Sequence, residues 1–217
     1  MAKQARSELT REAIVLGAAE AFDRFGYASA SLNDVIAQAG VTKGALYFHF
    51  SSKEELARAV IEAQHARSVS AGKQMIEQKA PGLESIIRLS QEMVRQLLEE
   101  PMVRAGIRLT LENGTFHSPV PDPYREWMQT IELLLRRAIV EKDVREMPAP
   151  EDLARFIVAA FTGVQLVSQV LTSRADLRRR IWEMWELLLP ALVPARKLPY
   201  FRNVASSLLG TVPESGR

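Results

Sequence analysis

Residues 31–50 have the sequence SLNDVIAQAGVTKGALYFHF, and this stretch decides the fold of the chain. Its pattern predicts two short helices joined by a tight turn. Ser31 is a favourable N-cap for the first helix, because its hydroxyl can accept a hydrogen bond from an unpaired backbone N–H. Gly40 ends that helix, since glycine readily adopts the left-handed conformation that follows many helices. Thr42 caps the second helix, so the stretch predicts a helix-turn-helix.

The second helix of this pair has two different sides. Leu46 and Phe50 are four residues apart and face the protein interior, whereas Lys43 and Tyr47, also four apart, face outward. No acidic residue lies within 42–51, and acidic side chains would repel phosphate. The alternative is an ordinary core hairpin with a solvated side. We favour a recognition helix that enters the major groove of DNA.

Short motifs in and around this stretch resemble the DNA-binding domain of the TetR family of bacterial repressors. The motifs are Gly26-Tyr27, Ser31-Leu32, the run AGVTKGALYFHF at 39–50 and the run SKEEL at 52–56. The run KGALYFHF, together with RAGIRL at 104–109 and Trp127, is similar to one branch of the family. That branch is the γ-butyrolactone receptors of antibiotic-producing bacteria, and the resemblance implies a repressor that a small signalling molecule releases from DNA.

The polar and small residues of the helix-turn-helix are the candidates for DNA contact. The predicted DNA-binding residues are Ser31, Thr42, Lys43, Gly44, Ala45, Tyr47, His49 and Lys53. Lys43 and Tyr47 would touch bases or nearby phosphates, and Gly44 and Ala45 are small enough for close approach. Thr42, Tyr47, His49 and Lys53 would fix the register of the protein on the phosphate backbone.

Composition excludes several other classes of protein. The chain has 217 residues, is 47% hydrophobic and 25% charged, and carries a net charge of only +2, so any DNA contact must come from a local basic patch. It has no cysteine, and its three histidines are scattered, which argues against disulfides and against a metal site. No nucleophile elbow, zinc motif, P-loop or dinucleotide fingerprint is present, so we expect no enzyme activity and no cofactor.

No targeting or membrane segment is expected. The N-terminus has no signal-peptide pattern. The most apolar stretch, 156–171, is interrupted by polar residues and is interpreted as too short and too polar to span a bilayer. We therefore expect a cytoplasmic protein with no membrane partner.

The remaining sequence predicts an all-α fold with two domains. A helix from about Thr10 to Phe25 precedes the helix-turn-helix and Gly26 ends it, while residues before about Ser7 form a mobile arm. In that arm Lys3 and Arg6 either reach phosphate or form a solvated tail. The DNA-binding domain is predicted at 1–52 and the ligand-binding and dimerisation domain at 53–217, with a helix at 53–70 as the connector. Further helices are expected at about 82–99, 101–112, 124–142, 151–171 and 177–191, with a short terminal helix after Pro199.

The last two long helices each carry two apolar stripes. On the first of them one stripe comprises Leu153, Ile157, Ala160, Val164, Val167 and Leu171, with Phe156, Gly163 and Val170 on the second side. On the next helix the stripes comprise Leu177, Ile181, Met184, Leu188 and Ala191, and Trp182, Trp185, Leu189 and Leu192. A surface helix of a monomer needs one stripe. We therefore predict a homodimer with a four-helix interface; deep burial inside a monomer is the alternative.

The predicted C-terminal domain also contains residues suited to an apolar ligand pocket. The predicted ligand-binding residues are Trp127, Gln64, Thr162, Gln165, Leu89, Met93, Phe161 and Val164, and Arg108 adds a further polar group. Binding pockets are mostly apolar with a few hydrogen-bonding groups. Each apolar residue alone is also compatible with plain core. Trp127 is the favoured one, because it aligns with a tryptophan that the resembled receptors use in their pocket.

These observations predict a ligand-responsive repressor that binds a pseudo-palindromic operator as a homodimer. A γ-butyrolactone or butenolide-like molecule would release it from DNA, and the regulated genes would belong to secondary metabolism. Two alternatives remain at this point. One is the same fold sensing an antibiotic or another hydrophobic compound, and the other is a helical enzyme or binding protein that has lost DNA binding.

Overall fold

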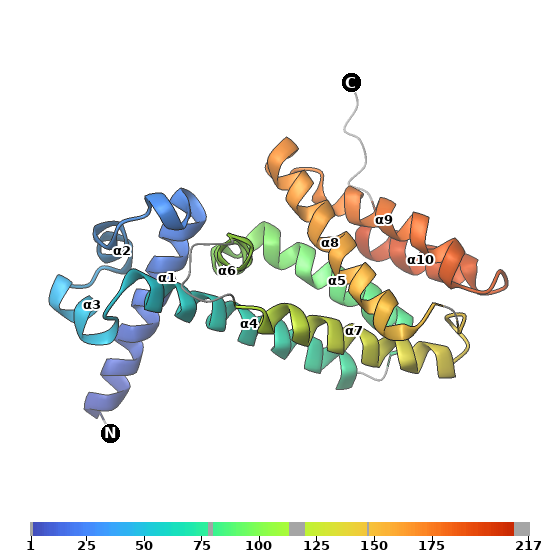
Figure 1. Cartoon of the computed structure of the whole chain (residues 1–217), viewed down its shortest axis with the longest axis horizontal. Helices are drawn as coiled ribbons and strands as arrows, with labels where there is room; N and C mark the ends of the chain where they lie inside the picture. The colour runs from blue at the N-terminus through green and yellow to red at the C-terminus, as the bar shows by residue number, and fades with distance from the viewer. Residues whose placement is uncertain (1, 78–79, 113–119, 147, 211–217) are drawn as a thin grey trace. The chain divides into compact units, whose positions relative to one another are not determined.

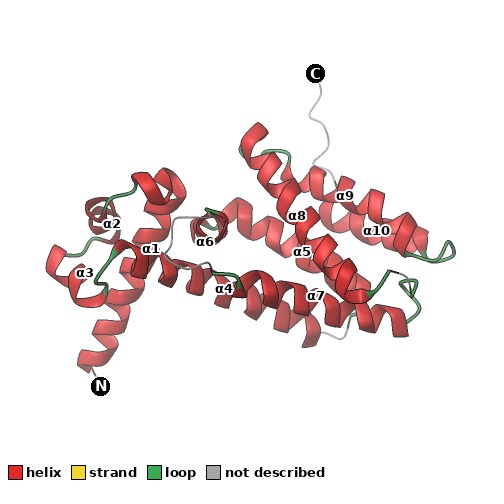
Figure 2. Cartoon of the chain, in the orientation of Figure 1, coloured by secondary structure: helices red, strands yellow, loops and turns green. Residues whose placement is uncertain are grey.

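The computed structural model describes residues 2–77, 80–112, 120–146 and 148–210. Within these residues every regular element is helical, which confirms the predicted all-α class (Figures 1 and 2). The elements are α1 (Ala2–Ser29), α2 (Leu32–Ala39), α3 (Lys43–His49), α4 (Lys53–Glu77), α5 (Gly82–Glu99), α6 (Pro101–Leu111), α7 (Asp122–Val140), α8 (Pro150–Thr172), α9 (Leu177–Leu192) and α10 (Leu198–Leu209).

The helices group into two compact units, and each unit is formed by two separate segments of the chain. Unit 1 comprises Met1–Val69 and Glu99–Pro121, and unit 2 comprises Ser70–Leu98 and Asp122–Arg217. Helix α6 therefore belongs to unit 1 although it follows α5 of unit 2, and α4 contributes to both. This is a division by packing, whereas the predicted border between 52 and 53 concerns function and stays a prediction.

Helix α1 differs from its prediction at the N-terminus. It begins at Ala2, so the expected mobile arm before Ser7 is wrong. Residues 2–9 contain no proline or glycine and are mostly good helix formers, and they extend the helix by two turns. At the other end Gly26 has φ 74° and ψ 169°, which breaks the helix as expected before one more turn that ends at Ser29.

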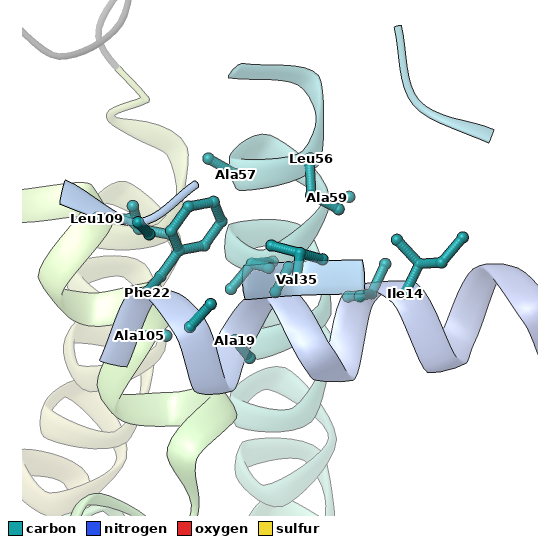
Figure 3. Close-up of a cluster of buried hydrophobic side chains, with 14 of the residues drawn as sticks. Ile14, Ala19, Phe22, Val35, Leu56, Ala57, Ala59, Ala105 and Leu109 are labelled. Atoms are coloured by element: carbon teal, nitrogen blue, oxygen red, sulfur yellow. The ribbon is translucent and has the colours of Figure 1, made fainter. Parts of the chain in front are cut away.

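The core of unit 1 draws on α1, α2, α3, α4 and α6, and Figure 3 labels members from α1, α2, α4 and α6. Its fully buried residues include Ile14, Ala18, Ala19 and Phe22 of α1, Val35 of α2, Leu46 of α3, Leu56, Ala57 and Val60 of α4, and Ala105 and Leu109 of α6. Helices α1 and α2 approach very closely, because a Cβ atom on Gly17 would lie 2.6 Å from the backbone nitrogen of Ala39. The helix-turn-helix is thus fixed to a rigid support.

Unit 2 contains α5 and a run of helices in which each packs on the next. Helix α7 packs on α8, α8 on α9, and α9 on α10. Polar contacts tie the ends of this run to the rest of the unit: the Tyr200 hydroxyl donates to Glu84 at 2.6 Å, and Lys197 pairs with Asp143. The fully buried residues of unit 2 include Leu83, Ile86, Ile87, Val94, Leu97, Leu134, Leu135, Leu177, Ile181, Trp185, Leu189 and Val193.

The two predicted α8 stripes divide differently in the structure, because Val167 and Leu171 of the first stripe lie exposed together with Phe156 and Val170 of the second. The buried side runs through Leu153, Ala154, Ile157, Val158, Gln165 and Ser168, whereas Val167 and Leu171 are exposed. The physical reason lies at the α8–α9 turn, where Asp176 accepts hydrogen bonds from Ser168 and Thr172 at 2.6 and 2.7 Å and pairs with Arg180. This polar contact turns Ser168, rather than Val167 or Leu171, toward α9.

Helix α8 is also longer than its sequence interpretation allowed. It has 23 residues and, in the part of the chain that the structure describes, it alone meets the length and hydropathy that a bilayer span requires. Core helices of globular proteins meet the same two requirements. Its exposed apolar side includes Phe156, Val167, Val170 and Leu171.

Candidate functional site

The first helix of the helix-turn-helix has the predicted caps. The Ser31 hydroxyl accepts from the Asp34 backbone N–H at 3.2 Å, and the Asp34 carboxylate accepts from the Ser31 backbone N–H at 2.8 Å. The hydrogen bonds from Ser31 hold the pKa of the Asp34 carboxyl below its ordinary value. Gly40 follows the helix with φ 63°, and its N–H donates to the carbonyl of Ile36. The turn into α3 is therefore rigid.

Helix α3 is fixed by its cap and by two buried side chains. The Thr42 hydroxyl accepts from the Ala45 backbone N–H at 3.2 Å. Leu46 and Phe50 are buried, which confirms the predicted inward side. A seven-residue helix has little stability alone, so this anchoring holds its outer side in place.

The outer side of α3 carries Lys43, Gly44, Tyr47 and Phe48. Tyr47 is 49% exposed and Phe48 is 80% exposed. The Lys43 ammonium lies 5.9 Å from the centre of the Tyr47 ring, within the range of a cation–π interaction. A Cβ atom on Gly44 would meet nothing within 4 Å, so the backbone there is open to an approaching surface. The structure thus presents a cation, two aromatic rings and bare backbone together.

The other predicted DNA-binding residues lie close to this side with differing freedom. His49 is half-buried, and its ring meets the Phe48 ring edge-on at 5.1 Å. Ala45 is also half-buried, while Ser31 and Thr42 are exposed but serve as helix caps.

Lys53 differs from Lys43 because its ammonium donates a hydrogen bond to a backbone carbonyl of the protein. The Lys53 Nζ atom donates to the Ala28 carbonyl at 3.2 Å and lies 4.6 Å from the centre of the Tyr27 ring. Partial burial lowers the pKa of this ammonium, and the charge of Glu112 opposes that effect.

Phe48 was not among the residues selected from the sequence. Phe48 could have been found from its spacing, because it lies four residues after Gly44. That spacing places both residues on the outer side of a helix whose inner side is defined by Leu46 and Phe50. The guanidinium of Arg11 on α1 lies 5.2 Å from the centre of the ring of Phe50, which belongs to the buried side of the motif.

The predicted ligand-binding residues fall into both units. Gln64 lies in unit 1, where it is buried, donates to the Ser68 hydroxyl at 2.8 Å and packs against Gly106. Arg108 is also in unit 1. The other seven lie in unit 2: Leu89 and Met93 on α5, Trp127 on α7, and Phe161, Thr162, Val164 and Gln165 on α8.

Unit 2 also contains polar groups that are partly or fully buried. The Thr162 hydroxyl donates to the Tyr124 hydroxyl at 3.5 Å, and burial raises the pKa of the Tyr124 phenol. The side-chain oxygen of Gln165 and the indole N–H of Trp185 are buried, and neither has a hydrogen-bond partner among the described residues. Tyr124 and Trp185 were not selected from the sequence, because an isolated aromatic residue on a helix is usually core.

Comparison with known proteins gives the family. Residues 14–60 match the family model described as "Bacterial regulatory proteins, tetR family", and residues 80–194 match "Tetracyclin repressor-like, C-terminal domain". The chain belongs to the TetR family. It is therefore a transcriptional regulator with a helix-turn-helix head and not an enzyme, and the resemblance stated from the sequence is confirmed.

Three relatives of this TetR-family chain are informative. It is 39% identical to the "A-factor receptor protein" of Streptomyces griseus over 88% of this chain and 67% of that protein. It is 34% identical to CprB from Streptomyces coelicolor, solved in complex with its operator, with a TM-score of 0.83 over 95% and 100% of the two chains. A structure described as a gamma-butyrolactone receptor (ArpA-like protein) is 35% identical, with a TM-score of 0.81 over 94% and 98%.

Proposed function

We propose that this chain is a γ-butyrolactone receptor-type repressor that binds a pseudo-palindromic operator. The single observation that carries the proposal is the outer side of α3, where Lys43, Tyr47 and Phe48 surround the open backbone of Gly44. Lys43 and Tyr47 contact base edges or phosphates in the major groove. Thr42 and His49 fix the register on the backbone. The operator complex of CprB supports this assignment, because its chain aligns with this one over nearly the whole length.

The proposed assembly is a homodimer formed through α8 and α9. Six large apolar side chains on these helices are exposed in the single chain: Phe156, Leu166, Val167, Val170, Leu171 and Leu187. Exposed apolar side chains concentrated on one helix mark an interaction site, and the same helix on a second copy gives a two-fold symmetric contact. A dimer places two recognition helices about 34 Å apart, so they enter successive major grooves. The same contact accounts for the apolar side of α8 without a bilayer.

The proposed effector is a small amphipathic γ-butyrolactone or butenolide that binds within unit 2. Trp127 and the apolar residues of α5 and α8 suit its alkyl chain, and the half-buried Thr162 hydroxyl and the buried side-chain oxygen of Gln165 suit its polar head. The effector acts by preferring a conformation with low operator affinity, so release is a shift of population. A regulator of this kind acts in the cytoplasm, where it controls secondary-metabolism genes.

The second candidate effector is an antibiotic or another hydrophobic compound made elsewhere. It is favoured by the same residues, because a mostly apolar lining selects weakly among hydrophobic molecules.

A gel shift against the upstream region of the protein's own gene tests both the DNA partner and the effector. The probe is incubated with purified protein, and synthetic γ-butyrolactones or a panel of antibiotics are then added. Release by γ-butyrolactones alone supports the first effector, and release by antibiotics alone supports the second. Absence of any shift with this DNA and with other palindromic promoter fragments would remove the proposed DNA-binding function.

A further inference from the structure

The segment from Asp23 to Ser31 joins the long supporting helix to the helix-turn-helix. Gly26 breaks α1 within it, and the Ala30 backbone N–H donates to the Gly26 carbonyl at 3.1 Å. Ala30 is buried, and Ser31 is the N-cap of α2. Only four residues lie between the break at Gly26 and the cap at Ser31, so the position of the backbone at Gly26 sets where α2 begins.

Two arginines of α6 hold this segment from one side. The Arg104 guanidinium donates to the Asp23 carboxylate at 2.9 and 2.8 Å, and both side chains are about three-quarters buried. The Arg108 guanidinium donates to the Asp23 carbonyl at 3.2 Å. It also covers Gly26, because a Cβ atom there would lie 2.3 Å from a terminal nitrogen of Arg108.

The apolar side of α6 brings these arginines to α1. Ala105 and Leu109 are buried in the same core as Phe22 and Ala19 (Figure 3). Arg104 and Arg108 are four residues apart and therefore lie on one side of the helix, one turn apart. Their spacing places them at two successive points of the segment, Asp23 and Gly26.

Helix α4 holds the same segment from a second side. The Lys53 ammonium donates to the Ala28 carbonyl and lies against the Tyr27 ring. Glu112, which pairs with Arg108 at 2.8 Å, also acts electrostatically on Lys53. The charged groups of α4 and α6 are thus connected around residues 23–28.

We propose that Arg104, Arg108 and Lys53 are positioning residues for operator binding. They contact the segment before α2 rather than DNA, and they fix the helix-turn-helix relative to α1. The part of this inference that concerns operator binding rests on the proposed function. The chain passes between units 1 and 2 within α4, so α4 holds the segment and also continues into unit 2, whereas α6 lies wholly within unit 1.

Hydrogen exchange of the free protein tests the positioning without any DNA. Arg104→Gln and Arg108→Gln each remove one contact, and Arg125→Gln is the control, because Arg125 loses the same charge from an exposed ion pair on α7. In the two test variants the amides of residues 27–50 should exchange about tenfold faster than in the parent protein and the control. Unchanged exchange in these residues would overturn the proposal.

A charge swap keeps the test valid if a single variant is poorly folded. Asp23→Arg combined with Arg104→Asp reverses the ion pair at partly exposed positions, so the pair can form again. The double variant should recover most of the slow exchange that either single variant loses, as coupled residues do in a double-mutant cycle. No recovery in a folded double variant would contradict the role of this ion pair.

The salt dependence of operator binding separates positioning from direct phosphate contact. Arg104→Gln, Arg108→Gln and Lys53→Gln should each weaken operator binding about tenfold while leaving the slope of log affinity against log salt unchanged. A slope smaller by about one would indicate a lost phosphate contact and would overturn the assignment for that residue. If the parent protein binds no operator but the exchange result holds, the proposed function fails and the inference that these residues fix the helix-turn-helix stands.

Discussion

At the scale of single residues, Tyr47 offers the most direct test of the recognition surface. It is half-exposed and makes no described contact with the core of unit 1, so its removal leaves the fold intact. Tyr47→Ala should weaken operator binding by roughly ten- to a hundredfold, the loss expected for a side chain that contacts DNA directly. Fluorescence anisotropy with the operator measures this. Tyr200→Ala, at a similarly exposed tyrosine of unit 2, is the control and should bind as the parent protein does.

Gly44 separates a requirement of DNA binding from a requirement of folding. Its position on α3 is helical and its surroundings are open, so alanine fits without a clash. Gly44→Ala should raise the free energy of unfolding by up to about 1 kcal/mol through better helix propensity. It should nevertheless weaken operator binding, because the added methyl group prevents close approach. Thermal unfolding measures the change in stability, and fluorescence anisotropy measures operator binding by the same sample. Equal or tighter operator binding would contradict a close approach of DNA at Gly44.

At the scale of elements, the capping box of α2 should make stability depend on pH. The pKa of the Asp34 carboxyl is lowered in the folded state by its hydrogen bonds from Ser31. Its contribution is therefore fully present above the unfolded pKa of about 4 and is lost as the pH falls through the folded pKa. Melting temperatures of the parent protein and Asp34→Asn, measured from pH 7 to pH 3, should differ most at neutral pH and converge under acid conditions. A constant difference would exclude this role of Asp34.

The sequence was sufficient where local chemistry determines an element. Ser31, Gly40 and Thr42 predicted the helix-turn-helix because a cap or a turn depends on one residue and its neighbours. The inward side of α3 followed from the spacing of Leu46 and Phe50. The all-α class followed from the helical spacing of apolar residues along the chain.

The sequence was insufficient where packing between distant segments decides. The buried side of α8 depends on the contact of Ser168 with Asp176 across a turn, and a stripe of valines and leucines does not show it. The inclusion of α6 in unit 1 rests on contacts between distant residues, such as the burial of Ala105 and Leu109 beside Phe22 and the pairing of Arg104 with Asp23, 81 residues earlier. The start of α1 at Ala2 was missed because propensity alone is a weak guide at chain ends. The predicted DNA and ligand contacts stay predictions.

At the scale of the whole molecule, the apolar surface of α8 should control assembly. Val170 is 76% exposed in the single chain, and burying a charge at a subunit contact is costly. Val170→Glu should shift the protein from dimer to monomer and weaken operator binding, because two linked heads bind far better than one. Light scattering after size exclusion measures the mass. Leu133→Glu on α7, also highly exposed, is the control, and a dimer that survives Val170→Glu would contradict this interface.

Effector response should be separable from operator binding. Trp127→Ala removes the favoured pocket residue of unit 2 and should leave the gel shift intact while abolishing release by a γ-butyrolactone. The release of Gln64→Ala by the same compound should be compared with that of Trp127→Ala, because Gln64 is the predicted ligand-binding residue that lies in unit 1, beside Ser68 and Gly106. Normal release of the Trp127 variant would remove that tryptophan from the effector site.

The membership of α6 in unit 1 limits how this protein can be cut or recombined. A fragment that ends after α4 lacks Ala105 and Leu109, and their absence leaves Phe22 exposed to water. We expect such a fragment to be poorly soluble even though it contains the complete helix-turn-helix. A hybrid regulator that joins this head to a foreign sensor should therefore carry residues 99–121 along with the head, so that the seam of the fusion falls between compact bodies and not through one of them.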